Sequence, residues 1–421
     1  MNTHRPTPPR TAAGAATLVM AIVLLCITTL MVLYLDRGLV FEQKASTNQM
    51  RATIAQEAAE AGLDWAAGML NHPEGRSATC EIDVPPAPSF RTRYVVPGST
   101  AAVASPGCSI GASGLDCACP ATGDATLAGT PQAGFTVSLA PDPQDPNGSV
   151  RIRSQGCAAP PSACTPANAD VADAAAVAFV TVKLRPLLRA APLSALTCGG
   201  NCQLIDQVAL ASSARESQGL LLHAGGNASA GPGVSLRSLP GTPGHTALVT
   251  HDPALSALAG ADPTCTQGLL FHAYFGAPLA AYAAAPTVLS LDCAAQSSCT
   301  QPLATAYARG WRAFHLPTGL VDDGAAGPLQ LGTPSDPVLL VSAGAVRLGG
   351  PVDIHGLLYL GHPGPDALRA DSARFTGAVV ACADLRLGGG TRLSYSTEVL
   401  QATRNAGSLM AKVPGTWKDF E

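Results

Sequence analysis

The sequence TAAGAATLVMAIVLLCITTLMVLYL at residues 11–35 contains no charged side chain over 25 positions. At about 1.5 Å of rise per residue, a helix over this stretch is roughly 37 Å long, which exceeds the hydrocarbon thickness of a bilayer. Gly14 is the only residue in the stretch that weakens a helix. The stretch therefore predicts a helix that spans a membrane once.

The flanks of this segment indicate its orientation and its length. Arg5 and Arg10 precede it without any acidic residue, so the positive-inside rule predicts a cytoplasmic N-terminus and a periplasmic ectodomain in the inner membrane. After it, residues that favour helices continue to Leu70, before the sequence His-Pro-Glu-Gly at 72–75. We expect one continuous helix, with at most a bend near Gly38.

Two simpler interpretations of this N-terminal region remain open. A cleaved secretory signal has a much shorter apolar core, followed by small residues at the cleavage site. A plain signal anchor that holds a periplasmic domain has the same composition as the observed segment, so composition alone cannot exclude it.

A third interpretation comes from a resemblance carried by several short motifs. They are RTAAGAATLV at 10–19, Glu42, Asn48, Gln49 and AQEAAEAGL at 55–63. Together they resemble the N-terminal region of PilX-type minor pilins, in which a basic leader ends in Gly and an Ala-rich apolar run opens a long helix. The resemblance covers about residues 10–70.

The resemblance implies that Gly14 is the last leader residue, cut by prepilin peptidase, and that Ala15 becomes an N-methylated N-terminus. Position 15 departs from the Phe or Met common in major pilins, and Val19 stands where major pilins carry Glu. The implied function is a minor pilin of the type IV pilus that primes or caps filament assembly. The implied partners are other minor and major pilins through the helix, prepilin peptidase, the inner membrane and a tip adhesin. The pilus or cell surface is the implied final location.

The composition favours β structure beyond the helix and excludes some partners. The 421 residues include 43 Gly and 35 Pro and are only 13% charged, which is typical of a turn-rich β ectodomain. The formal net charge is -4, and no Lys/Arg cluster with interleaved aromatic residues occurs. Nucleic acid is therefore not an expected partner.

Twelve of the thirteen cysteines follow the membrane segment, which contains Cys26. An even number in an exported domain predicts disulfides, and the spacings fit no zinc motif, so no metal or cofactor is expected. Short separations suggest three local pairs, although the connectivity cannot be deduced from the sequence: Cys157 with Cys164, Cys198 with Cys202, and Cys293 with Cys299.

A small antiparallel sheet is predicted after the helix. Alternating patterns mark strands at 90–96, 134–139, 149–154 and 177–184, and the middle two form a hairpin. This sheet resembles the one that pilin-like proteins pack on the exposed half of their long helix.

The last 220 residues or so contain weak internal repeats. QGLLLHA at 218–224 recurs as QGLLFHA at 267–273, and a strand, a Gly or polar corner and a second strand recur from Val346, Leu368 and Leu385. A period of 17–22 residues suits the coils of a β-solenoid, and a flat antiparallel meander is the alternative. Residues 337–341 (PVLLV) predict a buried strand.

These patterns predict an α+β protein with four parts. They are a leader at 1–14, a pilin-like transmembrane and exposed helix at 15–71, a pilin-like β domain with Cys-rich loops at 72–195, and a β-rich repeat domain at 196–421.

No catalytic motif occurs in the sequence, so no enzyme is predicted. His223 and His272 occupy equivalent positions of the repeat and are interpreted as one strand residue reused by duplication. The minor pilin is the preferred hypothesis. A membrane-anchored β-solenoid adhesin or surface-binding protein outside any filament is the alternative, and an unrecognised enzyme of the exported side is the third.

Overall fold

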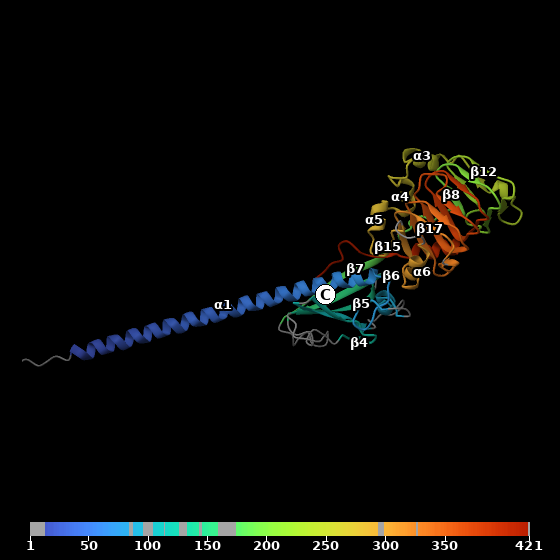
Figure 1. The fold of residues 1–421 in the computed structure, drawn as a ribbon. Coiled ribbons are helices and arrows are strands. Elements are labelled where there is room, and N and C mark those ends of the chain that lie inside the picture. Colours follow the sequence, from blue (N-terminus) through green and yellow to red (C-terminus); the bar gives the residue numbers. More distant parts are fainter. Residues whose placement is uncertain are drawn as a thin grey trace, which may run out of the picture.

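The computed structural model describes residues 13–83, 87–95, 104–112, 114–125, 133–142, 145–158, 174–293, 299–325 and 327–419. A long N-terminal helix leads into a small antiparallel β body, and a larger parallel β body lies beyond it, far from the start of the helix (Figure 1). The chain is therefore an α+β protein, as the sequence predicts.

Helix α1 (Ala13–Asn71) runs without interruption past Gly38, so the prediction of one continuous helix is confirmed. Side chains at 16–35 and 41–53 are exposed. Beyond them, buried residues recur every three or four positions, which is the spacing of one helical face: Ala55, Ala59, Leu63, Ala66 and Leu70. The helix thus has a free N-terminal part and a C-terminal part that packs on protein.

The sheet beneath α1 is antiparallel. Its strands, in spatial order, are β26 (Leu409–Lys412), β7 (Ala175–Arg185), β6 (Asp145–Cys157), β5 (Ala133–Asp142), β2 (Gly107–Gly111) and β3 (Gly114–Ala118). The predicted hairpin is confirmed as β5 and β6, and the predicted strand at 177–184 as β7. Beside this sheet, β1 (Ala104–Ser105) pairs in parallel with β4 (Gly123–Asp124).

The contact between helix and sheet depends on small residues. A Cβ added to Gly156 of β6 would lie 2.1 Å from the carbonyl oxygen of Ala55. A Cβ added to Gly62 of α1 would lie 2.1 Å from Oγ of Ser154. Two glycines on opposing elements therefore let the helix backbone approach the sheet closely.

The strand predicted at 90–96 is wrong, because Phe90–Tyr94 forms the short helix α2. Ser89 caps it, since its hydroxyl accepts a hydrogen bond from the backbone N–H of Thr92. Phe90 and Tyr94 are four residues apart, so a helix places both rings on one side, where both are buried. The spacing that resembled strand alternation suits this helical face as well.

The second body contains three sheets, whose strand pairs in the described parts are all parallel. The antiparallel meander is therefore excluded. The predicted strand-corner-strand units are β20 (Val346–Leu348) with β21 (Val352–Leu360), β22 (Leu368–Ala370) with β23 (Arg374–Ala381), and β24 (Leu385–Leu387) with β25 (Arg392–Tyr395). The predicted strand near 337–341 is β19 (Val338–Ser342), which is buried throughout.

The remaining short strands extend the stack at both ends. They are β8 (Leu196–Cys198), β9 (Cys202–Leu204), β10 (Ala209–Ser212), β11 (Leu222–Ala224), β12 (Ala228–Ala230), β13 (Ser235–Arg237), β14 (Leu248–Val249), β15 (Val288–Ser290), β16 (Ala313–Leu316), β17 (Leu320–Asp322) and β18 (Leu329–Leu331).

The order of the stack differs from the order of the chain. The last units, β23, β24 and β25, pair with the first three strands, β8, β9 and β10. On their other side, β8, β9 and β10 pair with β11, β12 and β13. The first strands of this body therefore lie between its last strands and the end of the stack.

Helices α3 (Pro253–Ala261), α4 (Leu269–Phe275) and α5 (Leu279–Ala283) connect the two ends of this stack. Helix η3 (Gly244–Thr246) precedes β14, and α6 (Thr300–Ala308) lies between β15 and β16. The prediction that 218–224 and 267–273 are structural repeats is wrong. The first segment ends in β11, whereas the second opens α4, so His272 is a helical residue. Phe271 and Phe275, four residues apart, bury the same face of α4 against Tyr359.

The end of the chain returns to the first body. Helix α7 (Thr397–Asn405) packs on β21 and β23, and β26 then pairs with β7. The side-chain amide of Asn71, at the end of α1, exchanges two hydrogen bonds with the backbone of Met410 in β26, at 2.7 and 3.0 Å. Part of the segment predicted as repeat domain thus completes the antiparallel sheet.

Candidate functional site

The free part of α1 is the largest exposed apolar surface among the described residues. Ala16–Leu35 has a mean hydropathy of 2.8, and none of it is buried in the protein. At about 1.5 Å per residue, these 20 residues reach roughly 30 Å, which is long enough to cross a bilayer. A surface of this size is unstable in water, so it must be covered by lipid or by other apolar helices.

Two hydroxyl groups within this segment are satisfied by the helix itself. The hydroxyl of Thr28 donates to the carbonyl of Leu25, and that of Thr29 lies 2.7 Å from the same oxygen. Such internal bonding lowers the cost of placing a hydroxyl in an apolar environment. Cys26 is a free, exposed cysteine on this surface.

The predicted processing residues lie at the start of α1. The helix begins at Ala13, so Gly14 and Ala15 are in its first turn, while residues 1–12 lie outside the described residues. Cleavage after Gly14 and methylation of Ala15 stay predictions.

The structure joins Cys198 to Cys202 and Cys293 to Cys299, the local pairs suggested by their spacing. Cys157 is disulfide-bonded, but Cys164 lies outside the described residues, so their pairing stays a prediction. Three further disulfides could not be deduced from spacing: Cys80–Cys119, Cys108–Cys117 and Cys265–Cys382.

The two repeat histidines do not come together as a site. His223 lies in β11, where Nε2 is 2.9 Å from a carboxylate oxygen of Asp252. Asp252 also caps α3, and its hydrogen bonds from the backbone N–H of Leu255 and from His223 hold its pKa below the usual range. Across the described ranges, no three His, Cys, Asp or Glu side chains are placed to hold a metal ion.

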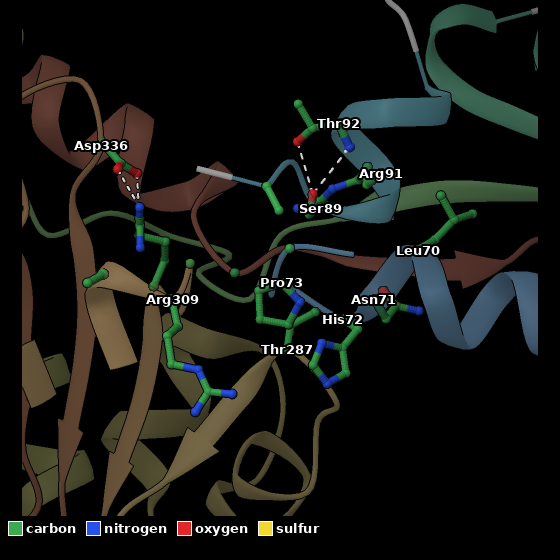
Figure 2. A pocket seen from close by; sticks show the side chains of 16 residues that line it. Leu70, Asn71, His72, Pro73, Ser89, Arg91, Thr92, Thr287, Arg309 and Asp336 are labelled. Atoms are coloured by element: carbon green, nitrogen blue, oxygen red, sulfur yellow. Dashed lines mark hydrogen bonds and ion pairs between the residues drawn. The ribbon is translucent and has the colours of Figure 1, made fainter. Parts of the chain in front are cut away.

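A polar cavity of about 330 Å³ lies where the end of α1 meets the parallel body. In Figure 2, residues from the end of α1 and the loop after it form one wall, and Arg309, after α6, lies on the opposite side. Arg309 forms an ion pair of 2.5 Å with Glu74, which is buried beneath it. The ring of His72 lies edge-on to Trp311, with centroids 5.8 Å apart. The cavity is therefore lined by both bodies.

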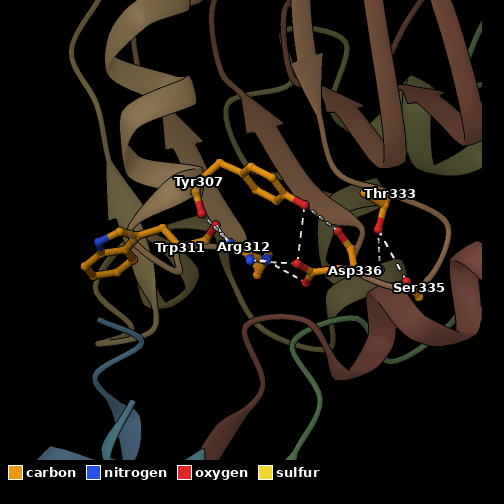
Figure 3. Close-up of polar contacts among 6 residues, drawn as sticks. All are labelled: Tyr307, Trp311, Arg312, Thr333, Ser335 and Asp336. Atoms are coloured by element: carbon orange, nitrogen blue, oxygen red, sulfur yellow. Dashed lines mark hydrogen bonds and ion pairs between the residues drawn. The ribbon is translucent and has the colours of Figure 1, made fainter. Parts of the chain in front are cut away.

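A second ion pair at this cavity joins Arg312 to Asp336, and the side chain of Tyr307 contacts both (Figure 3). Arg312 contacts both carboxylate oxygens of Asp336, with Nε–Oδ1 at 2.6 Å and Nη2–Oδ2 at 2.7 Å. The guanidinium carbon lies 4.1 Å from the ring centroid of Tyr307, whose hydroxyl donates to Asp336. Burial, with the nearby charge of Asp336, raises the pKa of Tyr307. These contacts fix the orientation of Arg312.

An arginine row crosses one face of the parallel body. It consists of Arg347, Arg369 and Arg386, the exposed central residues of β20, β22 and β24. Arg347 and Arg369 are direct register partners, so their strands are about 4.8 Å apart. A hydrogen bond from Arg369, with the charges of Arg386 and Arg347, lowers the pKa of Asp366 beside the row. Sequence reasoning noted the repeat but missed this basic row.

Helix α1 is apolar and exposed in its first half and packs on an antiparallel sheet in its second half, which is the arrangement that the resemblance implies. Residues 13–64 match the model of the family described as PilX N-terminal. This match confirms the resemblance over those residues and is consistent with a PilX-type pilin. No curated protein and no solved structure matches the chain.

Proposed function

We propose that this protein is a minor pilin of the type IV pilus, which primes or caps filament assembly through α1. One observation carries the proposal: a continuous helix that matches the PilX N-terminal family leaves a membrane-length apolar segment wholly exposed. The same face that contacts lipid before assembly packs against the helices of other minor and major pilins afterwards. Small residues such as Ala16, Ala21 and Thr28 permit close approach of neighbouring helices.

In this proposal the N-terminus is cytoplasmic and the ectodomain periplasmic in the inner membrane, and the protein later reaches the pilus or cell surface. Prepilin peptidase removes residues 1–14, and Ala15 is methylated. Val19 gives the subunit no acidic group at the position where major pilins carry Glu. Such a subunit adds poorly to a growing shaft and suits the start of the fibre, where a tip adhesin is a further partner. The proposal assigns no catalytic step to the chain.

The parallel body is then the part presented beyond the helix. We infer that it is a β-solenoid, since its short strands stack in register through parallel pairs. The large distance between this body and the start of α1 keeps it clear of a helical fibre core (Figure 1).

Deleting the chain tests this function. The proposal predicts fewer surface pili, and sparse, terminal labelling when the protein is detected by immunogold. Uniform labelling along the shaft would contradict a priming or capping role. An unchanged number of pili would contradict any role in assembly.

The arginine row favours a second candidate function, a membrane-anchored adhesin or surface-binding protein that does not enter a filament. Three exposed guanidinium groups on neighbouring strands, one of which (Arg369) is ion-paired with Asp366 at 2.8 Å, provide a basic strip for a negatively charged surface. Replacing all three by glutamine should then reduce attachment to an anionic surface while the number of pili stays unchanged. Unchanged attachment would remove the support for this function.

A further inference from the structure

The arginine row is part of a larger basic surface that turns a corner of the parallel body. In each strand-corner-strand unit the first strand carries one arginine of the row. The second strands of the last two units add Arg374 and Arg392, which are exposed and are direct register partners. Five exposed arginines therefore lie on three neighbouring units, on the two faces that meet at this corner.

Most of this positive charge has no carboxylate partner. Arg369 forms an ion pair with Asp366 at 2.8 Å, whereas Arg347 and Arg386 act on the same carboxylate only through their charge. Within the described parts of the chain, the four arginines other than Arg369 form no ion pair. Asp353 is the register partner of an arginine on β23, but its nearest described cation is a histidine nitrogen at 3.8 Å. An anionic partner can therefore contact these four guanidinium groups directly.

The spacing of the arginines suits a partner whose charge repeats along an extended chain. Neighbouring strands are about 4.8 Å apart, so the three units present guanidinium groups over roughly 10 Å along the stack. A small anion contacts one or two of these groups, whereas a linear polyanion laid along the stack contacts all of them. Contacts made by one polymer reinforce one another, because each holds the next charge within reach of its arginine.

Acceptor groups among the arginines narrow the class of polyanion. Asp371 is exposed at the corner, where its Oδ1 would lie 2.9 Å from a Cβ added to Gly389 of the next unit. Gln203 of β9 continues the row as the register partner of Arg386, and its side-chain oxygen accepts a hydrogen bond from Nε of that arginine. Carboxylate oxygens accept hydrogen bonds from hydroxyl groups but repel phosphates, and a DNA backbone has no hydroxyl to donate. A polysaccharide of acidic sugars has carboxylates for the arginines and hydroxyl groups for Asp371.

The same surface fits a membrane less well. Proteins that lie on a membrane combine basic side chains with large apolar ones that enter the lipid. Beside the described part of the row, Val321 of β17 is the one large apolar side chain that is exposed, at 40%.

We propose that the five arginines bind a linear acidic polysaccharide, which lies along the stack of the parallel body. This inference rests on the second candidate function, that of an adhesin or surface-binding protein, and names the class of its ligand.

The test is calorimetric titration of the full chain in nanodiscs of zwitterionic lipid. The probes are polygalacturonate, its monomer galacturonate, neutral dextran and duplex DNA. Polygalacturonate should bind at least about tenfold more tightly than each of the others, since the monomer makes fewer contacts, dextran has no charge and DNA is repelled by Asp371. Equal affinity for the monomer would overturn the extended polymer, equal affinity for dextran the role of charge, and equal affinity for DNA the assignment of a sugar.

Co-sedimentation with phosphatidylglycerol vesicles separates this inference from the function on which it rests. Binding to the vesicles without binding to polygalacturonate would overturn the polysaccharide and leave the surface-binding function in place. Binding to neither would overturn both.

Variants locate the binding. Replacing Arg347 and Arg386 together by glutamine should weaken polygalacturonate binding by about tenfold or more. Replacing Arg215 and Arg237 together by glutamine is the matched control, because both are exposed arginines of the same body outside the basic surface. The control should leave binding unchanged, and both double variants should keep the unfolding temperature of the unchanged protein, since all four side chains are exposed. Equal weakening by the two double variants would contradict the proposal.

Discussion

Gly62 and Gly68 form a matched pair that tests how closely α1 packs on its sheet. Both lie inside α1, so replacing either by alanine gains about 1 kcal/mol of helix propensity. At Gly68 the new Cβ meets nothing within 4 Å. At Gly62 it would lie 2.1 Å from Oγ of Ser154 and 2.9 Å from the ring of Phe135, both of which are fully buried.

Because the propensity gain is common to both variants, their difference isolates the packing cost. Overpacking of this kind costs about 1–3 kcal/mol. Gly68→Ala should therefore be neutral or stabilising, and Gly62→Ala should be less stable than Gly68→Ala by about 1–3 kcal/mol. The Ser154 hydroxyl has no partner, so Ser154→Ala should remove part of this difference.

Urea unfolding of the full chain in detergent micelles, followed by the fluorescence of Trp65, measures this difference. Trp65 is a suitable reporter because its ring lies 5.4 Å from that of Phe90 and 5.6 Å from that of Phe135. Replacing Trp311 and Trp417 by phenylalanine in all variants isolates its signal. Equal midpoints for Gly62→Ala and Gly68→Ala would refute the close packing of α1 on the sheet.

Two further predictions concern the parallel body and its junction with α1. The disulfide Cys265–Cys382 closes a segment of 117 residues, whereas Cys198–Cys202 closes one of 4. Because a longer closed loop restricts the unfolded chain more, replacing the first pair by serine should destabilise the parallel body by about 3 kcal/mol more than replacing the second pair. Urea unfolding measured by circular dichroism compares the two, and equal losses would contradict the argument. Burial lowers the pKa of His72 below 6.5, so the unfolded chain binds a proton more readily below that pH. The free energy of unfolding should fall as the pH falls from 6.5, and this fall should be shallower in His72→Gln than in the unchanged protein. Identical pH dependence in the two proteins would contradict the prediction.

Local patterns in the sequence predicted the elements that depend on local interactions. The apolar run at 16–35 and the uninterrupted helix formers after it determine α1, and alternation determines β5, β6 and β7. Where the spacing of apolar residues fits both a helix and a strand, the prediction was wrong. Phe90 and Tyr94 satisfy a helix as well as a strand, and the segment 267–273 leads into helix α4 although it resembles 218–224, which ends in β11.

The features that remained hidden are contacts between distant segments. Nothing in the local sequence of β26 indicates that it pairs with β7, because its partners, β7 and the side chain of Asn71, come from segments far earlier in the chain. The cavity likewise joins Arg91, Thr287 and Arg309 from separate segments. Their identities could be read from the sequence, but their proximity could not.

Mass spectrometry of the mature N-terminus tests the central claim most directly. The protein should be purified from cells that assemble pili, and its N-terminal peptide sequenced. The account predicts a chain that begins at Ala15 with an N-methyl group, because under the proposed function residues 1–14 are removed before α1 enters a filament. A mature chain that retains residues 1–14 would contradict it and would indicate a simple membrane anchor.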